Sequence, residues 1–105
     1  MTTAVLTSLS NQPVTGPVAK LSVDVSGLPS GLMGAYAVVE ATVPGFAFEM
    51  GIGVASLMYR PNPQDVYAYL FAGPGTYTMR LKVNTFDQAG HFTSVFGDPI
   101  TVQAA

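Results

Sequence analysis

Few residues of this sequence are able to do chemistry. There is one histidine, His91, and there is no cysteine, which excludes thiol catalysis, disulfides and cysteine zinc sites. His91 has only Asp87 and Asp98 near it in the sequence, a set too sparse for a zinc site with three or four ligands. We therefore expect His91 at a solvent-facing turn, and we predict no metal site and no cofactor.

The sequence shows no constellation for acid–base or nucleophilic catalysis. The six acidic residues that could supply a carboxylate pair are Asp24, Glu40, Glu49, Asp65, Asp87 and Asp98. No two of them are close in sequence, and no Gly-x-Ser-x-Gly elbow marks a serine nucleophile. A calcium site in end loops would draw on Asp65 and Asp87, but a dense Asp-x-Asp cluster is absent. The sequence predicts that the protein is not an enzyme.

The composition is that of one small, apolar and weakly charged domain. The chain has 105 residues, a length that normally makes a single domain. Hydrophobic residues reach 49% and charged residues only 10%, which excludes intrinsic disorder. The net charge of -2 provides no basic surface for nucleic acid, so no nucleic-acid partner is expected.

The N-terminal part of the chain has no targeting signal. Met1 to Asn11 lacks the basic region and the apolar core of a signal peptide, and no apolar stretch is long enough to cross a membrane. If Met1 is native, we expect a protein made in the cytoplasm, with no membrane partner. Thr2 to Gly16 is rich in Thr, Ser, Asn and Pro, which predicts an extended arm over residues 1–16 and a domain over residues 17–105.

Alternating apolar and polar residues predict short strands separated by Gly and Pro turns. The segments with this pattern are Val18 to Val25, Ala35 to Val43, Val66 to Phe71, Thr76 to Asn84, His91 to Phe96 and Ile100 to Val102. One strand or two short ones are expected in Phe46 to Tyr59, where Gly51 and Gly53 interrupt the pattern. Without any helical periodicity, these segments predict an all-β, two-layer sandwich of about seven antiparallel strands.

The C-terminal hairpin carries a resemblance to a known superfamily. Pro74 to Val83 (PGTYTMRLKV), followed by Asp87 to Gly90 (DQAG), resembles the last hairpin of immunoglobulin-like domains of the PKD and fibronectin type III kind. The resemblance implies a single immunoglobulin-like β-sandwich in which Tyr77 is the tyrosine of the corner motif, its hydroxyl bonded to nearby backbone. The sequence departs from those families in having no tryptophan for the core.

Apolar residues crowd the middle of the chain, beside few charges. Either both faces of a central strand are covered there, or the residues form an interface, where aromatics and Met are enriched. Likewise, Tyr67, Tyr69 and Phe71 form one inward row, or a docking patch if the residues between them face inward. The interface candidates are Phe46, Phe48, Met50, Met58, Tyr59, Tyr67 and Tyr69.

Two functions fit these observations. The first is a non-catalytic structural subunit located in a virion, such as a capsid decoration (cement) protein bound to a protein lattice or present as a homo-oligomer. By analogy, immunoglobulin-like folds are common in virion accessory proteins, and the arm would order on a neighbour. The second is a carbohydrate-binding or spacer module of a secreted or cell-surface protein, with Met1 added by cloning. Its candidate aromatics are Tyr36, Tyr59, Tyr67 and Tyr69.

Overall fold

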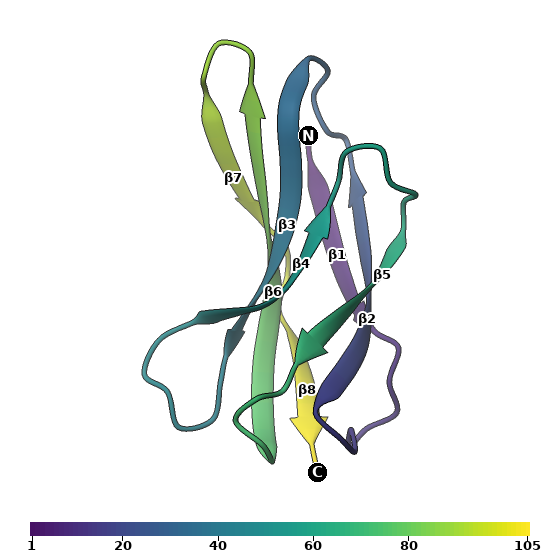
Figure 1. The fold of residues 1–105 in the computed structure, drawn as a ribbon, viewed down its shortest axis with the longest axis vertical. Helices are drawn as coiled ribbons and strands as arrows, with labels where there is room; N and C mark the ends of the chain where they lie inside the picture. Colours follow the sequence, from purple (N-terminus) through teal and green to yellow (C-terminus); the bar gives the residue numbers. More distant parts are fainter.

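A computed structural model describes all 105 residues, and its regular structure is entirely β-strand (Figure 1). The eight strands are β1 (Thr3–Ser8), β2 (Val18–Ser26), β3 (Leu32–Thr42), β4 (Met50–Ser56), β5 (Gln64–Tyr69), β6 (Gly75–Asp87), β7 (Phe92–Phe96) and β8 (Ile100–Ala104). No helix is present that is long and apolar enough to cross a membrane. The predicted all-β fold is confirmed, with one strand more than expected.

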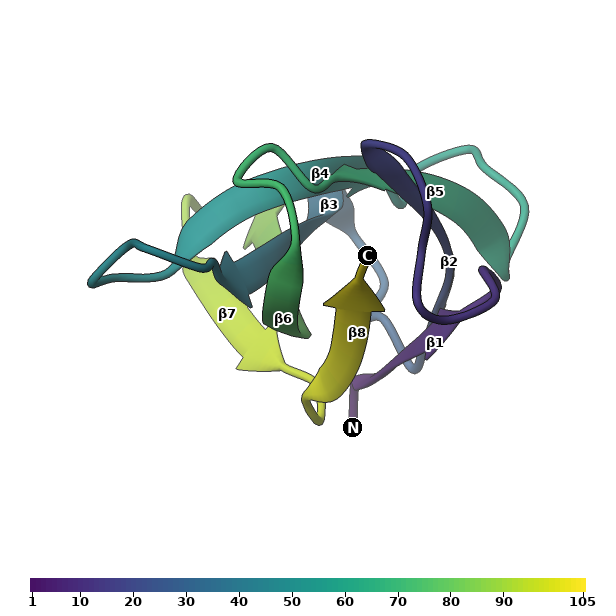
Figure 2. The same ribbon diagram turned by 90° about the horizontal axis from the view of Figure 1, so that it is seen from below.

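Two antiparallel sheets pack on each other (Figure 2). One has three strands in the order β1-β2-β5, and the other has five, in the order β4-β3-β6-β7 with β8 also on β6. β7 and β8 share one edge of the long strand β6, because Lys82 to Phe86 pair with β7 and Gly75 to Met79 pair with β8. Gly97 to Pro99 separates the two strands. This arrangement is compatible with an immunoglobulin-like fold.

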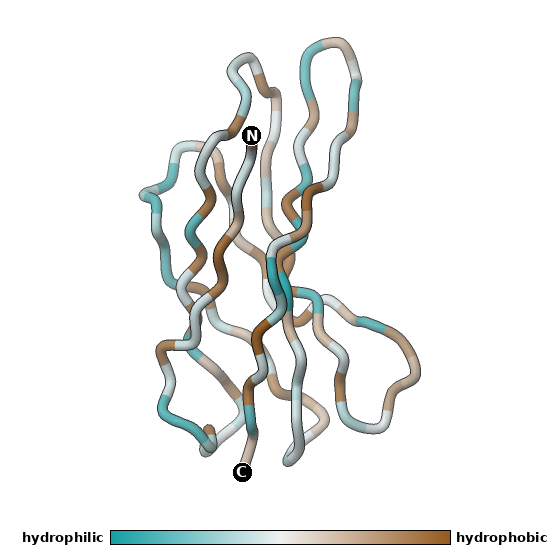
Figure 3. The backbone as a smooth tube through the Cα atoms, turned by 180° about the vertical axis from the view of Figure 1, so that it is seen from behind, coloured by the Kyte–Doolittle hydropathy of each residue, from teal (hydrophilic) through white to brown (hydrophobic).

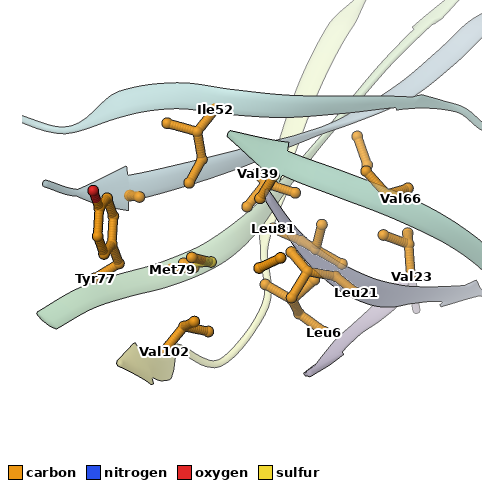
Figure 4. Packing of buried hydrophobic residues seen from close by; sticks show 14 of the residues in the cluster. Leu6, Leu21, Val23, Val39, Ile52, Val66, Tyr77, Met79, Leu81 and Val102 are labelled. Carbon is orange, nitrogen blue, oxygen red and sulfur yellow. The ribbon is translucent and has the colours of Figure 1, made fainter. Parts of the chain in front are cut away.

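The core lies between the sheets and follows the predicted alternation. On β6, Tyr77, Met79 and Leu81 are fully buried, whereas the polar residues between them lie on the outer face. Buried hydrophobic residues from both sheets form one cluster, part of which is seen in Figure 4. Thr85 is the single buried polar residue. The hydropathy of the trace alternates along the strands accordingly (Figure 3).

The N-terminal segment differs from the extended arm predicted for residues 1–16. Thr3–Ser8 forms β1, which pairs along its whole length with β2 and buries Ala4 and Leu6. Val14 is also buried and forms a parallel bridge with Ala104, so the segment joins both sheets. The Thr- and Ser-rich composition concealed a short alternating pattern whose apolar members fill the core. The sandwich therefore begins at β1 and not at residue 17.

The molecule is elongated, with extents of 44 × 28 × 18 Å. The two chain ends lie toward opposite ends of its long axis, and the hairpin of β6 and β7 projects at the end nearer the N-terminus (Figure 1). At the tip of this hairpin Asp87 to Gly90 form the predicted turn, in which Gly90 takes a φ of 83°.

Candidate interaction surface

The aromatic row of β5 and the residues that follow it face outward. Val66, Ala68 and Leu70 are buried, and Tyr67 and Tyr69 are 61% and 57% exposed. The physical reason is the antiparallel pairing with β2, in which Val66 lies opposite Leu21 and Ala68 opposite Ala19, all on the core face. Of the two orientations that the sequence left open, the structure has the one required by a docking patch.

An open groove of about 340 Å³ lies between β4 and the end of β5. Its lining residues are Val38, Gly51, Ile52, Gly53, Val54, Tyr69 and Phe71. β4 and β5 are edge strands of different sheets, and they come close at Gly53, where a Cβ would lie 3.0 Å from the Tyr67 carbonyl oxygen. The glycine thus permits the close approach of two sheet edges beside the groove.

Aromatic side chains gather at one side of the groove. The rings of Phe46 and Phe71 meet edge to face with centroids 5.5 Å apart, and those of Tyr69 and Phe71 are 6.0 Å apart. Phe46 and Tyr69 were among the interface candidates, whereas the sequence-based set omitted Phe71 and the exposed Val54. The sequence analysis did place Phe71 in one row with Tyr67 and Tyr69, and in the structure it continues the outward row of β5 by one alternation.

The structure does not bring the other interface candidates into this groove. Phe48 is exposed in the loop before β4, and Met50 and Met58 are half-buried, with Met50 packed against the core. Tyr59 is 98% exposed and has a φ of 60°, a left-handed conformation that favours glycine. Tyr67 lies on the outer face of β5, next to the groove.

The groove carries no charged residue. The ion pairs on the neighbouring strands are closed, with Lys20 Nζ 3.4 Å from Asp65 Oδ2 and Arg80 Nη2 3.1 Å from Glu49 Oε2. The Arg80 guanidinium also lies 4.1 Å from the centroid of the Phe96 ring. A molecule seated on the lining residues would therefore meet apolar side chains, backbone and the Tyr69 ring, and no charged lining residue.

His91 and Asp87 lie at the turn between β6 and β7, whereas Asp98 lies between β7 and β8. Asp87 Oδ1 accepts hydrogen bonds from the backbone N–H groups of Ala89 and His91, both at 3.0 Å. These two hydrogen bonds hold the pKa of the Asp87 carboxyl below its ordinary value, and the bond from the His91 N–H has the larger effect. His91 is exposed, as predicted, and no group of three or more His, Asp or Glu residues is placed to hold a metal ion.

Tyr77 makes the contact that the resemblance implies. Its side chain is fully buried, and its hydroxyl donates a hydrogen bond of 2.8 Å to the carbonyl of Gly73 in the preceding turn. The bond ties the loop after β5 to the start of β6. It also satisfies a phenolic group that would otherwise be buried without a partner.

Comparison with known protein families finds no match to this chain, and comparison with curated protein sequences finds none either. What the structure establishes is an all-β sandwich of two antiparallel sheets. An account of its function therefore has to start from the chemistry of its surface.

Proposed function

We propose that this protein is a non-catalytic structural subunit that binds a larger protein assembly through the groove between β4 and β5. The observation that carries the proposal is the outward aromatic row of β5, next to an apolar groove without charge. The cores of protein interfaces are enriched in aromatic residues and depleted in charged ones. Large apolar side chains held in or beside a concave surface are the usual anchors of binding.

The form of assembly that we propose is a virion, with the chain acting as a capsid decoration protein or another accessory subunit. The support is analogy of fold, since immunoglobulin-like sandwiches are common in virion accessory proteins. The strand pattern and the Tyr77 contact support the more specific likeness to PKD and fibronectin type III modules. The partner would then be a lattice of capsid subunits.

A second candidate function is carbohydrate binding on the cell surface or outside the cell. Tyr67 and Tyr69 project from the same face of one strand, and both are more than half exposed. Such neighbouring rings offer flat apolar faces with a polar hydroxyl, which suits the stacking of sugar rings. In this case the binding element is the pair of tyrosines and not the groove.

The test compares two aspartate variants placed at exposed valines. Val54→Asp puts a carboxylate in the groove, and Val5→Asp puts one on the outer face of β1, in the other sheet. Tagged proteins are produced in the source cells, and their sedimentation with the particle fraction is measured on a density gradient. We expect the wild-type protein and Val5→Asp to sediment with particles and Val54→Asp to remain at the top.

Three results would overturn the proposal or replace it. Equal sedimentation of both variants with particles would show that the groove is not the binding site. A wild-type protein that never sediments with particles would contradict the assembly function. Binding of the wild-type protein to a glycan array, lost in Tyr67→Ala and Tyr69→Ala but kept in Val54→Asp, would establish the carbohydrate alternative.

A further inference from the structure

The exposed edges of a sheet carry unpaired peptide groups, and natural proteins protect such edges against pairing with another chain. In this molecule the edge of β8 is covered by the segment before β2. The Val14 N–H donates to the Gln103 carbonyl at 2.8 Å, and the Ala105 N–H donates to the Val14 carbonyl at 2.9 Å. The Gln103 N–H donates to Gln12 Oε1 at 2.7 Å. The peptide groups of this edge are thus satisfied within the chain.

Three further edges of the sandwich, those of β4, β5 and β1, are protected as well. β4 has a register shift in its pairing with β3, and its Ser56 carbonyl accepts a hydrogen bond of 2.7 Å from Gln64 Nε2. β5 has its Tyr67 carbonyl close to Gly53 of β4. β1 lies against the junction of β7 and β8, where a Cβ on Gly97 would come within 2.6 Å of the Ala4 carbonyl oxygen.

β7 is the edge that lacks any such protection. Its sequence, Phe-Thr-Ser-Val-Phe, contains no charge, no proline and no glycine, and its pairing with β6 is regular from Phe92 to Phe96. Phe92 is 81% exposed and Phe96 is 47% exposed. Edge strands of this kind are the ones that pair with another chain.

Two hydrogen bonds fix which peptide groups of β7 are free. The Asp87 N–H donates to the His91 carbonyl at 3.2 Å, and the Gly97 N–H donates to the Leu81 carbonyl at 3.0 Å. In an antiparallel ladder the bonded residues alternate, so those in between direct their N–H and C=O away from the neighbouring strand. The residues of β7 with free, outward peptide groups are therefore Phe92, Ser94 and Phe96.

We propose that two copies of this chain pair antiparallel through β7, about a two-fold axis at Ser94. In this register Ser94 faces Ser94 of the second copy, and Phe92 faces the second copy's Phe96. Each residue with outward peptide groups then meets another such residue, which is the condition for a fully bonded ladder. The two five-stranded sheets join into one continuous sheet in a closed, isologous dimer.

β7 suits pairing with a second copy of itself because its two phenylalanines are placed symmetrically about Ser94. Phenylalanines stand at equal distances on both sides, so the pairing makes two cross-strand aromatic pairs. β7 itself carries no charged residue, so no like charges oppose each other within the paired strands.

The dimer goes beyond the proposed function and does not depend on it, because β7 and the groove lie at opposite edges of the five-stranded sheet. Val54→Asp therefore should leave the dimer intact. A loss of particle binding with an intact dimer, or the reverse, would show which of the two proposals fails.

Disulfide trapping tests the register, since the wild-type chain has no cysteine. Directly opposed residues of a bonded pair have Cα atoms about 5.5 Å apart, which a disulfide can span. We expect Ser94→Cys to form a covalent dimer on mild oxidation. The matched control, Thr93→Cys on the same strand, faces Val95 of the second copy, so no cysteine lies opposite it and it should not form a covalent dimer. Equal trapping at both positions, or none at residue 94, would overturn the proposed pairing.

Light scattering after size exclusion tests the dimer without cross-linking. The wild-type protein should be a dimer. Ser94→Pro should be a monomer, because proline lacks the N–H that would donate to the second copy. The N–H of Ser94 makes no hydrogen bond to β6, so the pairing of β7 with β6 is kept. Ser94→Ala removes the hydroxyl bond to Asn84 Oδ1 but keeps the N–H, so it should remain a dimer. A wild-type monomer at every concentration, or a Ser94→Pro dimer, would contradict the proposal.

Discussion

β5 carries Tyr67 and Tyr69 and β6 carries Tyr77, yet the tyrosines of β5 lie on the outer face of the sandwich whereas Tyr77 faces its core. Tyr77 of β6 is fully buried, whereas Tyr67 of β5 is 61% exposed. The difference lies in the residues that alternate with these tyrosines along each strand. Thr, Arg and Lys alternate with the apolar row of β6, whereas Val66 and Ala68 alternate with the tyrosines of β5. Alternation thus defines two faces of a strand, but it identifies the inner one only where the other face is polar.

The largest expected effect distinguishes the buried tyrosine of β6 from the exposed tyrosines of β5. Tyr77→Ala leaves a cavity among fully buried neighbours and should reduce the free energy of unfolding by about 3–5 kcal/mol. Tyr69→Ala, on the exposed row, should change it by no more than about 0.5 kcal/mol. Urea denaturation of both variants measures this. Similar losses would mean that Tyr77 and Tyr69 do not differ in burial as described.

A smaller change isolates the hydroxyl of Tyr77 from its ring. Tyr77→Phe keeps the packing but leaves the Gly73 carbonyl without its 2.8 Å bond, which should cost about 1 kcal/mol. Tyr67→Phe is the control, because no hydrogen bond of the Tyr67 hydroxyl is present and its side chain is exposed. Thermal unfolding should show a lower midpoint for Tyr77→Phe only, and an equal midpoint for both would refute the role of the bond.

The far ends of the two strands should also differ in their response to acid. The turn after β6 is held by the Asp87 carboxylate, whose pKa is lowered chiefly by the bond from the His91 N–H. Its stabilisation is present above the ordinary value of 3.8 and is lost as the pH falls through the lowered pKa. In Asp87→Asn this part of the acid sensitivity should disappear, as measured by amide exchange at the turn. The turn after β5 carries no carboxylate and serves as the internal reference.

The smallest effect is expected from making β5 resemble β6. Tyr67→Thr gives β5 a polar outer residue like those of β6, and the free energy of unfolding should change by less than about 0.5 kcal/mol. Binding to particles or glycans is the property that should respond. A large loss of stability in urea would show that Tyr67 contributes to the core.

The sequence predicted the faces of β2 and β6 because their outer residues are mostly polar, so each pattern has one solution. It did not predict β1, whose short apolar alternation lies in a Thr-rich segment. The groove could not be predicted either. It requires β4 and β5, from different sheets, to meet at Gly53, and that contact depends on the packing of the whole sandwich. The sequence also could not predict that β7 and β8 pair with the same edge of β6. The residues between the two strands indicate only that the chain is interrupted there.

The bridge between residue 14 and β8 has a mechanical consequence. The segment near the N-terminus and the last strand run parallel, joined by hydrogen bonds from Val14, Gln103 and Ala105. A force that pulls the two ends of the chain apart would draw these segments past one another in shear. All of their bonds would then carry the tension together instead of opening one at a time. Stretched in a single-molecule experiment, the sandwich should resist until this patch yields as a unit.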